Sequence, residues 1–87
     1  MKSIAATYDI ASCQIQQGLL VEAQKTSQWL LTQRPLNIDI ISLHIEVLIK
    51  RDLRVQAQRF LREALMELNK VRPESRRLLM KRFAELL

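Results

Sequence analysis

Glycine and proline, the residues that most tight turns require, are scarce in this sequence. One glycine and two prolines occur in 87 residues. Sheets need such turns between their strands, so this scarcity argues against a β-rich fold, and the many Leu, Ala, Gln, Glu, Arg and Lys residues favour helices. No apolar run approaches the roughly 20 residues that cross a bilayer, and the N-terminus lacks the continuous apolar core of a secretory signal. We therefore expect a cytoplasmic all-α protein without a membrane span.

Residues that carry chemistry are also few. The chain has one histidine, one cysteine, nine scattered carboxylates and no glycine-rich loop that could cradle a phosphate, whereas catalysis usually gathers several reactive groups in one cleft. His44 has no second histidine or cysteine at metal-ligand spacing, so a packed or surface role is favoured over metal binding. Cys13 cannot form an internal disulfide and is expected to be a small buried hydrophobe. We expect neither an enzyme nor a bound metal or cofactor.

Positive charge is concentrated in the second half of the chain. Residues 1–49 contain three basic and four acidic side chains, whereas residues 50–87 contain eleven basic and five acidic ones. This asymmetry is compatible with an acidic partner or a polyanion. A charge-rich helix is more often only a solvated face, which is the favoured interpretation.

Apolar residues recur at helical spacing in five segments, separated by Gly18, Pro35, a basic turn at residues 50–52 and Pro73. Ser3 and Asn37 are suitable caps for the first and third segments. The expected helices cover about Ser3 to Gln17, Leu20 to Pro35, Ile38 to Lys50, Leu53 to Val71 and Glu74 to Leu86. The third segment is apolar nearly all round, which predicts a central helix buried on several sides, although its β-branched residues would also suit a strand. Trp29 lies away from the main stripe of the second helix, so an interface and a packed position are equally compatible with it.

A shift of 34 residues aligns the chain with itself. The shift places Ala23 on Ala57, Ala11 on Ile45 and Gly18 on Asp52. This is the length of a tetratricopeptide repeat. In the stretch from Gln17 to Ala23, the glycine and the alanine five residues later match the interhelical turn and the close helix contact of that family, and Pro35 falls at its closing proline. The chain therefore resembles a tetratricopeptide-like helical repeat protein.

That resemblance implies a single domain over residues 1–87, built from antiparallel helical hairpins. Repeat one covers about residues 4–37, repeat two about residues 38–71, and a C-terminal capping helix about residues 74–87. The second repeat departs from the family pattern, because Asp52 replaces the glycine and the closing proline comes four residues late, at Pro73. We expect its second helix to be about one turn longer.

In tetratricopeptide arrays the first helix of each repeat lines a concave face that accepts a segment of a partner protein. The partner-binding residues implied by this resemblance come from the first, third and capping helices; they are Ala5, Tyr8, Ser12, Ile15, Asp39, Ser42, Glu46, Ile49, Arg76, Met80 and Phe83. This face is mainly apolar with a few charges, which suits an amphipathic helix laid in a groove. Ile15, Ile49 and Phe83 are also at core spacing, and for each of them core packing is slightly favoured.

A narrower resemblance rests on four short segments. They are Glu22-Ala23, Ser27 to Leu30, Ile40 to Leu43 and Lys50-Arg51-Asp52, and together they look like the small chaperones that guard the needle subunit of bacterial type III secretion systems. In that family a compact tetratricopeptide-like protein pairs with a still smaller helical co-chaperone. The two clasp the amphipathic C-terminal helix of the needle subunit and prevent its premature polymerisation in the cytoplasm. The resemblance thus implies a protein-binding chaperone or adaptor in a hetero-oligomer.

Two other function classes remain open. A nucleic-acid or polyanion binder would use the cations of the second half; they are Arg54, Arg59, Arg62, Arg72, Arg76, Arg77, Lys81 and Arg82. Few aromatic residues are available for base stacking and acidic residues are interleaved with the cations, so nucleic-acid binding is not favoured. A structural homo-oligomer would pair the apolar third helix and the capping helix across a symmetry axis.

Overall fold

The structure, a computed structural model, describes residues 3–87. These residues form five α-helices and one 3-10 helix and contain no strand. The elements are α1 (Ile4–Gln16), α2 (Leu20–Gln33), α3 (Ile38–Lys50), α4 (Arg54–Val71), α5 (Pro73–Arg82) and η1 (Ala84–Leu86). The predicted all-α class is confirmed, and the third segment is a helix rather than a strand. Met1 and Lys2, which the predicted domain includes, lie outside the described residues.

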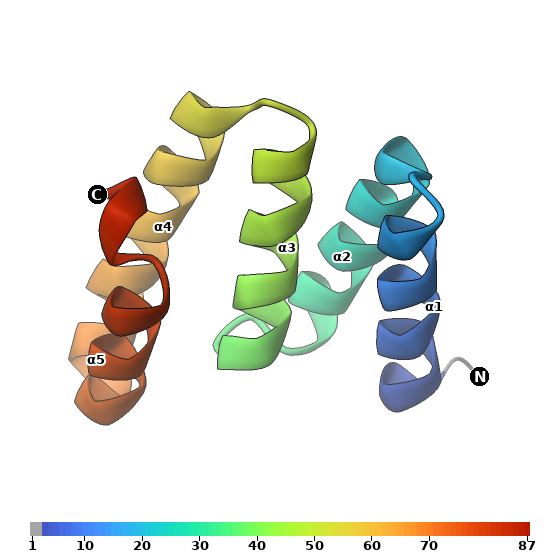
Figure 1. Cartoon of the computed structure of the whole chain (residues 1–87). Coiled ribbons are helices and arrows are strands. Elements are labelled where there is room, and N and C mark those ends of the chain that lie inside the picture. Colours follow the sequence, from blue (N-terminus) through green and yellow to red (C-terminus); the bar gives the residue numbers. More distant parts are fainter. Residues whose placement is uncertain (1–2) are drawn as a thin grey trace.

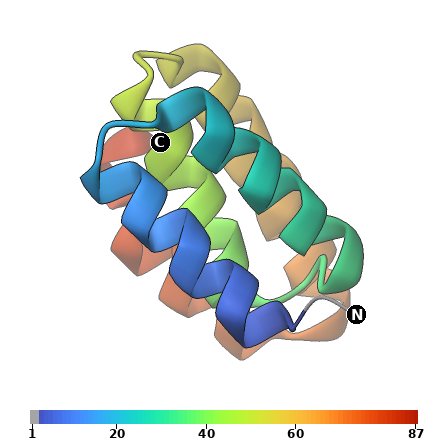
Figure 2. The ribbon, with the colours of Figure 1, turned by 90° about the vertical axis from the view of Figure 1, so that its right-hand side faces the viewer.

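The helices run antiparallel in sequence order and form two layers (Figure 1). One layer contains α1, α3 and α5, and the other contains α2 and α4 behind them. Each helix packs mainly on the next one in the chain, and smaller contacts join α1 to α3 and α3 to α5. Figure 2 shows the α1–α2 hairpin from its outer side, with the other helices behind it. The resulting molecule is flat, with principal extents of 31 × 30 × 16 Å.

The two hairpins repeat at an interval of 34 residues. Helices α1 and α3 are both 13 residues long and begin 34 positions apart, as do α2 and α4. Their caps repeat as well, since Ser3 Oγ accepts the Ala6 amide at 3.3 Å and Asn37 Oδ1 accepts the Ile40 amide at 3.1 Å. Helix α4 has 18 residues against 14 in α2. The predicted extra turn of the fourth helix is confirmed.

The turns inside the two hairpins have the same backbone conformation. Gly18 after α1 has φ 79° and Asp52 after α3 has φ 61°, so both residues are left-handed. The following amides bond five residues back, from Leu19 to the Gln14 carbonyl at 2.8 Å and from Leu53 to the Leu48 carbonyl at 2.9 Å. This pattern closes a helix end in the Schellman manner. Asp52 therefore occupies a position that glycine adopts without steric cost.

Helix α3 lies at the centre of the core. Seven of its 13 residues are buried; they are Ile40, Ile41, Leu43, His44, Ile45, Val47 and Leu48. Ile40 and Leu43 pack with Ala11 and Leu30 of the first hairpin, whereas the other side of α3 packs with α4 and α5. The prediction that this helix is buried on several sides is confirmed. Each hairpin thus buries its apolar face on the same central helix.

The C-terminal segment differs from the predicted helix over Glu74 to Leu86. Helix α5 begins at Pro73, ends at Arg82 and is followed by η1. Phe83 leaves the helical conformation, with φ −123° and ψ 32°, and the chain turns so that Leu86 is buried. Gln58 Nε2 on α4 donates to the Leu86 carbonyl at 2.8 Å. Burial of Leu86 and this hydrogen bond replace the last turn that helical periodicity predicts.

Candidate partner-binding face

Helices α1, α3 and α5 form one layer, and we refer to its outer surface as the α1–α3–α5 face (Figure 1). Between α1 and α3 lies an open depression of about 520 Å³. Its lining residues are Ile4, Ala5, Tyr8, Asp9, Arg34, Asn37, Asp39 and Ile40. Three of them, Ala5, Tyr8 and Asp39, are among the predicted partner-binding residues. The depression combines apolar side chains with two carboxylates.

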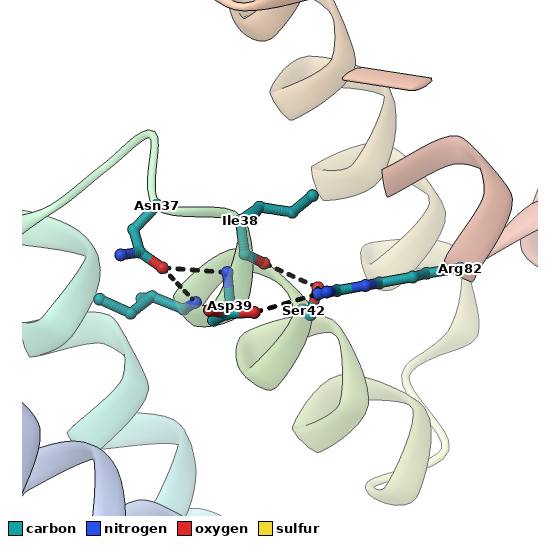
Figure 3. A network of polar contacts seen from close by, with 6 residues as sticks. Asn37, Ile38, Asp39, Ser42 and Arg82 are labelled. Atoms are coloured by element: carbon teal, nitrogen blue, oxygen red, sulfur yellow. Dashed lines mark hydrogen bonds and ion pairs between the residues drawn. The ribbon is translucent and has the colours of Figure 1, made fainter. Parts of the chain in front are cut away.

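A polar network joins α5 to the start of α3 on this face (Figure 3). Arg82 Nη1 donates to Asp39 Oδ1 at 3.2 Å and to Ser42 Oγ at 3.1 Å, and Ser42 Oγ donates to the Ile38 carbonyl at 2.7 Å. The side chains of Arg82 and Asp39 remain 39% and 64% exposed. The sequence analysis placed Asp39 and Ser42 on this face but treated Arg82 only as a possible phosphate-binding cation. Nothing in the local sequence indicates a contact across 43 residues.

Tyr8 lies in the electrostatic field of this network. The residue is half-buried and packs against the cluster of Ala11, Leu30, Ile40 and Leu43. Burial raises the pKa of the Tyr8 phenol, and the negative charges of Asp39 and Glu46 raise the pKa further, while Arg82 opposes them. The structure therefore brings side chains from α1, α3 and α5 into one polar environment.

The eleven predicted partner-binding residues are all at least half-exposed or half-buried, and none is fully buried. Ala5, Asp39, Glu46 and Ile49 are exposed; Tyr8, Ser12, Ile15, Ser42, Arg76, Met80 and Phe83 are half-buried. Ile15, Met80 and Phe83 pack against the edges of the core clusters. The favoured core packing therefore holds for Ile15 and Phe83, whereas Ile49 is 39% exposed and does not complete the core.

The α5 end of the face has a different charge. A second depression of about 400 Å³ lies beside α5 and η1, and its lining includes Ile49, Arg54, Lys81 and Arg82. One carboxylate, Glu85, is also present there. The α1–α3–α5 face thus runs from a carboxylate-rich depression at α1 to a cation-rich depression at α5.

His44 lies away from this face, between the two hairpins. Only 6% of the residue is exposed, its Nδ1 is 2.6 Å from Ser27 Oγ, and its ring packs edge-on against Phe60 with centroids 4.8 Å apart. Burial lowers the pKa of the imidazole, because the charged form would lose its hydration. The packed role favoured by the sequence is confirmed. Among residues 3–87 no three His, Cys, Asp or Glu side chains are grouped closely enough to hold a metal ion.

Two other predicted residues have definite positions. Trp29 is half-buried and packs against the cluster around Ala11 and Leu30, so the packed alternative describes it. Cys13 is exposed, which corrects the expectation that it is buried. On α1 the small residue Ala11 occupies the core position two residues before Cys13, and this turns the thiol toward solvent.

The cations of the second half are spread over α4, α5 and the adjoining turns. Arg54, Arg59, Arg62, Arg72, Arg77 and Lys81 are exposed, whereas Arg76 is half-buried. Arg82 is held by Asp39 on the α1–α3–α5 face. Within residues 3–87 no helix combines the length and the apolar character that crossing a membrane requires.

Comparisons of the chain with protein-family models, with curated proteins and with solved structures find no match. The function proposed below therefore rests on the geometry of the chain and on its sequence.

Proposed function

We propose that this chain is a tetratricopeptide-like chaperone or adaptor that binds an amphipathic helix of another protein on its α1–α3–α5 face. One observation carries the proposal. All eleven residues that the repeat pattern assigns to partner binding keep some solvent exposure, although they belong to helices whose opposite sides form the core. Such a surface offers apolar area and polar rim groups without further unfolding of the chain.

The repeat geometry supports the tetratricopeptide-like assignment. The helix starts, the caps and the left-handed turns all recur after 34 residues. With this spacing the first helices of successive repeats lie side by side in one layer, and α5 continues that layer. A helical partner segment would contact α1, α3 and α5 together.

The needle subunit of a type III secretion system is the partner that the sequence resemblance implies, in a cytoplasmic complex that also contains a small helical co-chaperone. The fold is compatible with this role because the two hairpins expose a flat layer rather than an enclosed pocket. The homo-oligomer alternative requires a free apolar surface on the third helix. Most apolar residues of α3 are instead buried within the chain, which favours a partner of different sequence.

The proposal is tested with two neighbouring alanines on α1. Ala5 and Ala6 are both exposed, but only Ala5 lines the depression between α1 and α3. Tagged wild-type chain, Ala5→Trp and Ala6→Trp are each used for affinity capture from the native lysate, and co-purifying proteins are identified by mass. We expect Ala5→Trp to lose a small helical partner that Ala6→Trp retains, because the indole fills the depression.

Circular dichroism of both variants shows whether the helices are intact. A partner that both variants retain equally would contradict binding at this face. Recovery of nucleic acid alone, lost as the salt concentration rises, would instead support the polyanion alternative and its exposed cations.

A further inference from the structure

The α1–α3 part of the α1–α3–α5 face carries excess negative charge although the whole chain is basic. The formal charge is +5, yet Asp9, Asp39 and Glu46 are all exposed on α1 and α3. Asp39 and Asp9 line the depression, and Glu46 acts on Tyr8 at its rim. At physiological ionic strength charges more than about 8 Å away are largely screened. The local carboxylates, rather than the net charge, therefore govern what approaches this surface.

These carboxylates are only partly neutralised by the chain itself. Within residues 3–87 the ion pairs are Arg82 with Asp39, at 3.2 Å, and Lys70 with Glu67 elsewhere on α4. Asp9 and Glu46 have no cation within ion-pair distance in this part of the chain. Arg82 also contacts Ser42, so a guanidinium already fits between α3 and its neighbour on this face. Two carboxylates remain available to a cation from outside.

Apolar groups lie beside these charges. Ile4, Ala5 and Ile40 line the same depression as Asp9 and Asp39. Side chains three or four positions apart on a helix are about 5–6 Å from one another at their Cβ atoms. A partner helix can therefore place one apolar side chain in the depression and a lysine or arginine, one turn away, beside a carboxylate.

We propose that the helix bound on the α1–α3–α5 face is cationic, with a lysine or arginine one turn from an apolar residue that enters the depression between α1 and α3. This inference rests on the proposed function and specifies its partner. Each exposed ion pair contributes little, at most about 1 kcal/mol, so two or three of them amount to about a tenfold preference. Electrostatic complementarity of this kind mainly sets specificity and the rate of association.

The test uses two synthetic amphipathic helical peptides with the same leucine-rich face. Their flanking positions carry lysine in one peptide and glutamate in the other, and binding to the full chain is measured by fluorescence anisotropy at low and at physiological salt. We expect the lysine peptide to bind about tenfold more tightly. The double substitution Asp9→Asn, Glu46→Gln should remove this preference, because neither carboxylate serves an ion pair among residues 3–87.

Two matched controls separate a local effect from net charge. Glu63→Gln with Glu74→Gln removes two exposed carboxylates outside the face and should leave the preference unchanged. Arg82→Gln should tighten binding of the lysine peptide, because the peptide no longer competes with Arg82 for Asp39. Arg77→Gln removes a positive charge from the same helix and should have little effect.

Each outcome decides between the two proposals. If both peptides bind equally and Ala5→Trp abolishes both, the face binds helices but the cationic partner is wrong. If the preference survives Asp9→Asn, Glu46→Gln, the carboxylates named here do not produce it and the inference fails. If neither peptide binds the folded chain, the proposed function and the inference fail together.

Discussion

At the scale of single residues, the environment of His44 has the clearest consequence for stability. The imidazole is buried between the hairpins and bonded to Ser27 Oγ, and Ser27 also donates to the Gln24 carbonyl at 3.0 Å. A hydroxyl has one hydrogen, so when Ser27 donates to Gln24 the His44 Nδ1–H donates to Ser27. The network satisfies a buried polar pair without requiring a charged imidazole.

The first prediction concerns pH. Burial lowers the pKa of His44 in the folded state below the ordinary value of about 6.5, so in the window between these values the unfolded chain binds more protons. The free energy of unfolding should therefore fall as pH drops below about 6.5 and level off below the folded pKa. Urea unfolding at about pH 7.5 and about pH 5.5 measures this loss.

His44→Gln is the control, since the chain has no other histidine. The variant should be less stable at neutral pH but should lose less stability between the two pH values. A direct NMR titration of the imidazole that gave an unshifted or raised pKa would contradict the account of His44.

The residue-level predictions from sequence were uneven for a physical reason. Periodicity identifies which face of a helix a residue occupies, and this correctly predicted exposure of Ala5, Asp39 and Glu46. It cannot identify long-range pairing, which depends on how helices are placed in space. The contact of Arg82 with Asp39 and the burial of His44 beside Ser27 therefore emerge only from the structure.

At the scale of elements, the two hairpin turns provide the second prediction. Gly18 and Asp52 are both left-handed, and a Cβ added to Gly18 would meet nothing within 4 Å, so any effect there comes from the backbone. We expect Gly18→Ala to destabilise the chain by about 1 kcal/mol and Asp52→Gly to be neutral or stabilising by up to about 1 kcal/mol. Chemical denaturation of both variants measures the two changes.

Opposite signs at the two positions are the diagnostic result. Equal destabilisation by both substitutions would mean that the Asp52 side chain contributes more to the turn than its backbone strain costs.

The third prediction tests whether α5 belongs to the core. Leu79 is 0% exposed and packs in the cluster with Ile45, Leu61 and Leu68, whereas the adjacent Leu78 is 47% exposed. Leu79→Ala should cost about 2–5 kcal/mol, and Leu78→Ala less than about 0.5 kcal/mol. Thermal or urea unfolding of the pair gives both values.

If Leu79→Ala has as little effect as Leu78→Ala, α5 is a loosely attached segment and Arg82 cannot hold a fixed place on the α1–α3–α5 face.

Element boundaries were predictable where local signals mark them. Ser3, Gly18, Asn37 and Pro73 lie at helix ends, and the helices begin or end within one residue of these signals. The end of α5 has no such signal. The chain departs from the helix at Phe83 because Leu86 finds a buried position near the start of α4, which is a tertiary effect.

At the scale of the whole molecule, the flat two-layer arrangement follows from one central helix. Because α3 buries apolar side chains toward both hairpins, α1 and α5 pack on either side of it and the three helices share one surface. The charge of that surface changes from carboxylates near α1 to cations near α5. A partner helix lying across it would be fixed in position by apolar contact and in orientation by charge.

The sequence predicted the repeat interval, the helix order and the layer that holds the candidate face, because these depend on periodic patterns and turns. The depth of the depressions and the charge gradient depend on side chains from three helices, so no single stretch of sequence indicates them.

The most direct test of the account is amide hydrogen exchange of the chain alone and in complex with the partner that affinity capture recovers. We predict slower exchange in α1, α3 and α5, including the amides near Tyr8, Ser42 and Leu78, with little change in the outer turns of α2 and α4. Protection confined to α2 and α4, with α1, α3 and α5 unchanged, would contradict the claim that this protein binds its partner on the α1–α3–α5 face.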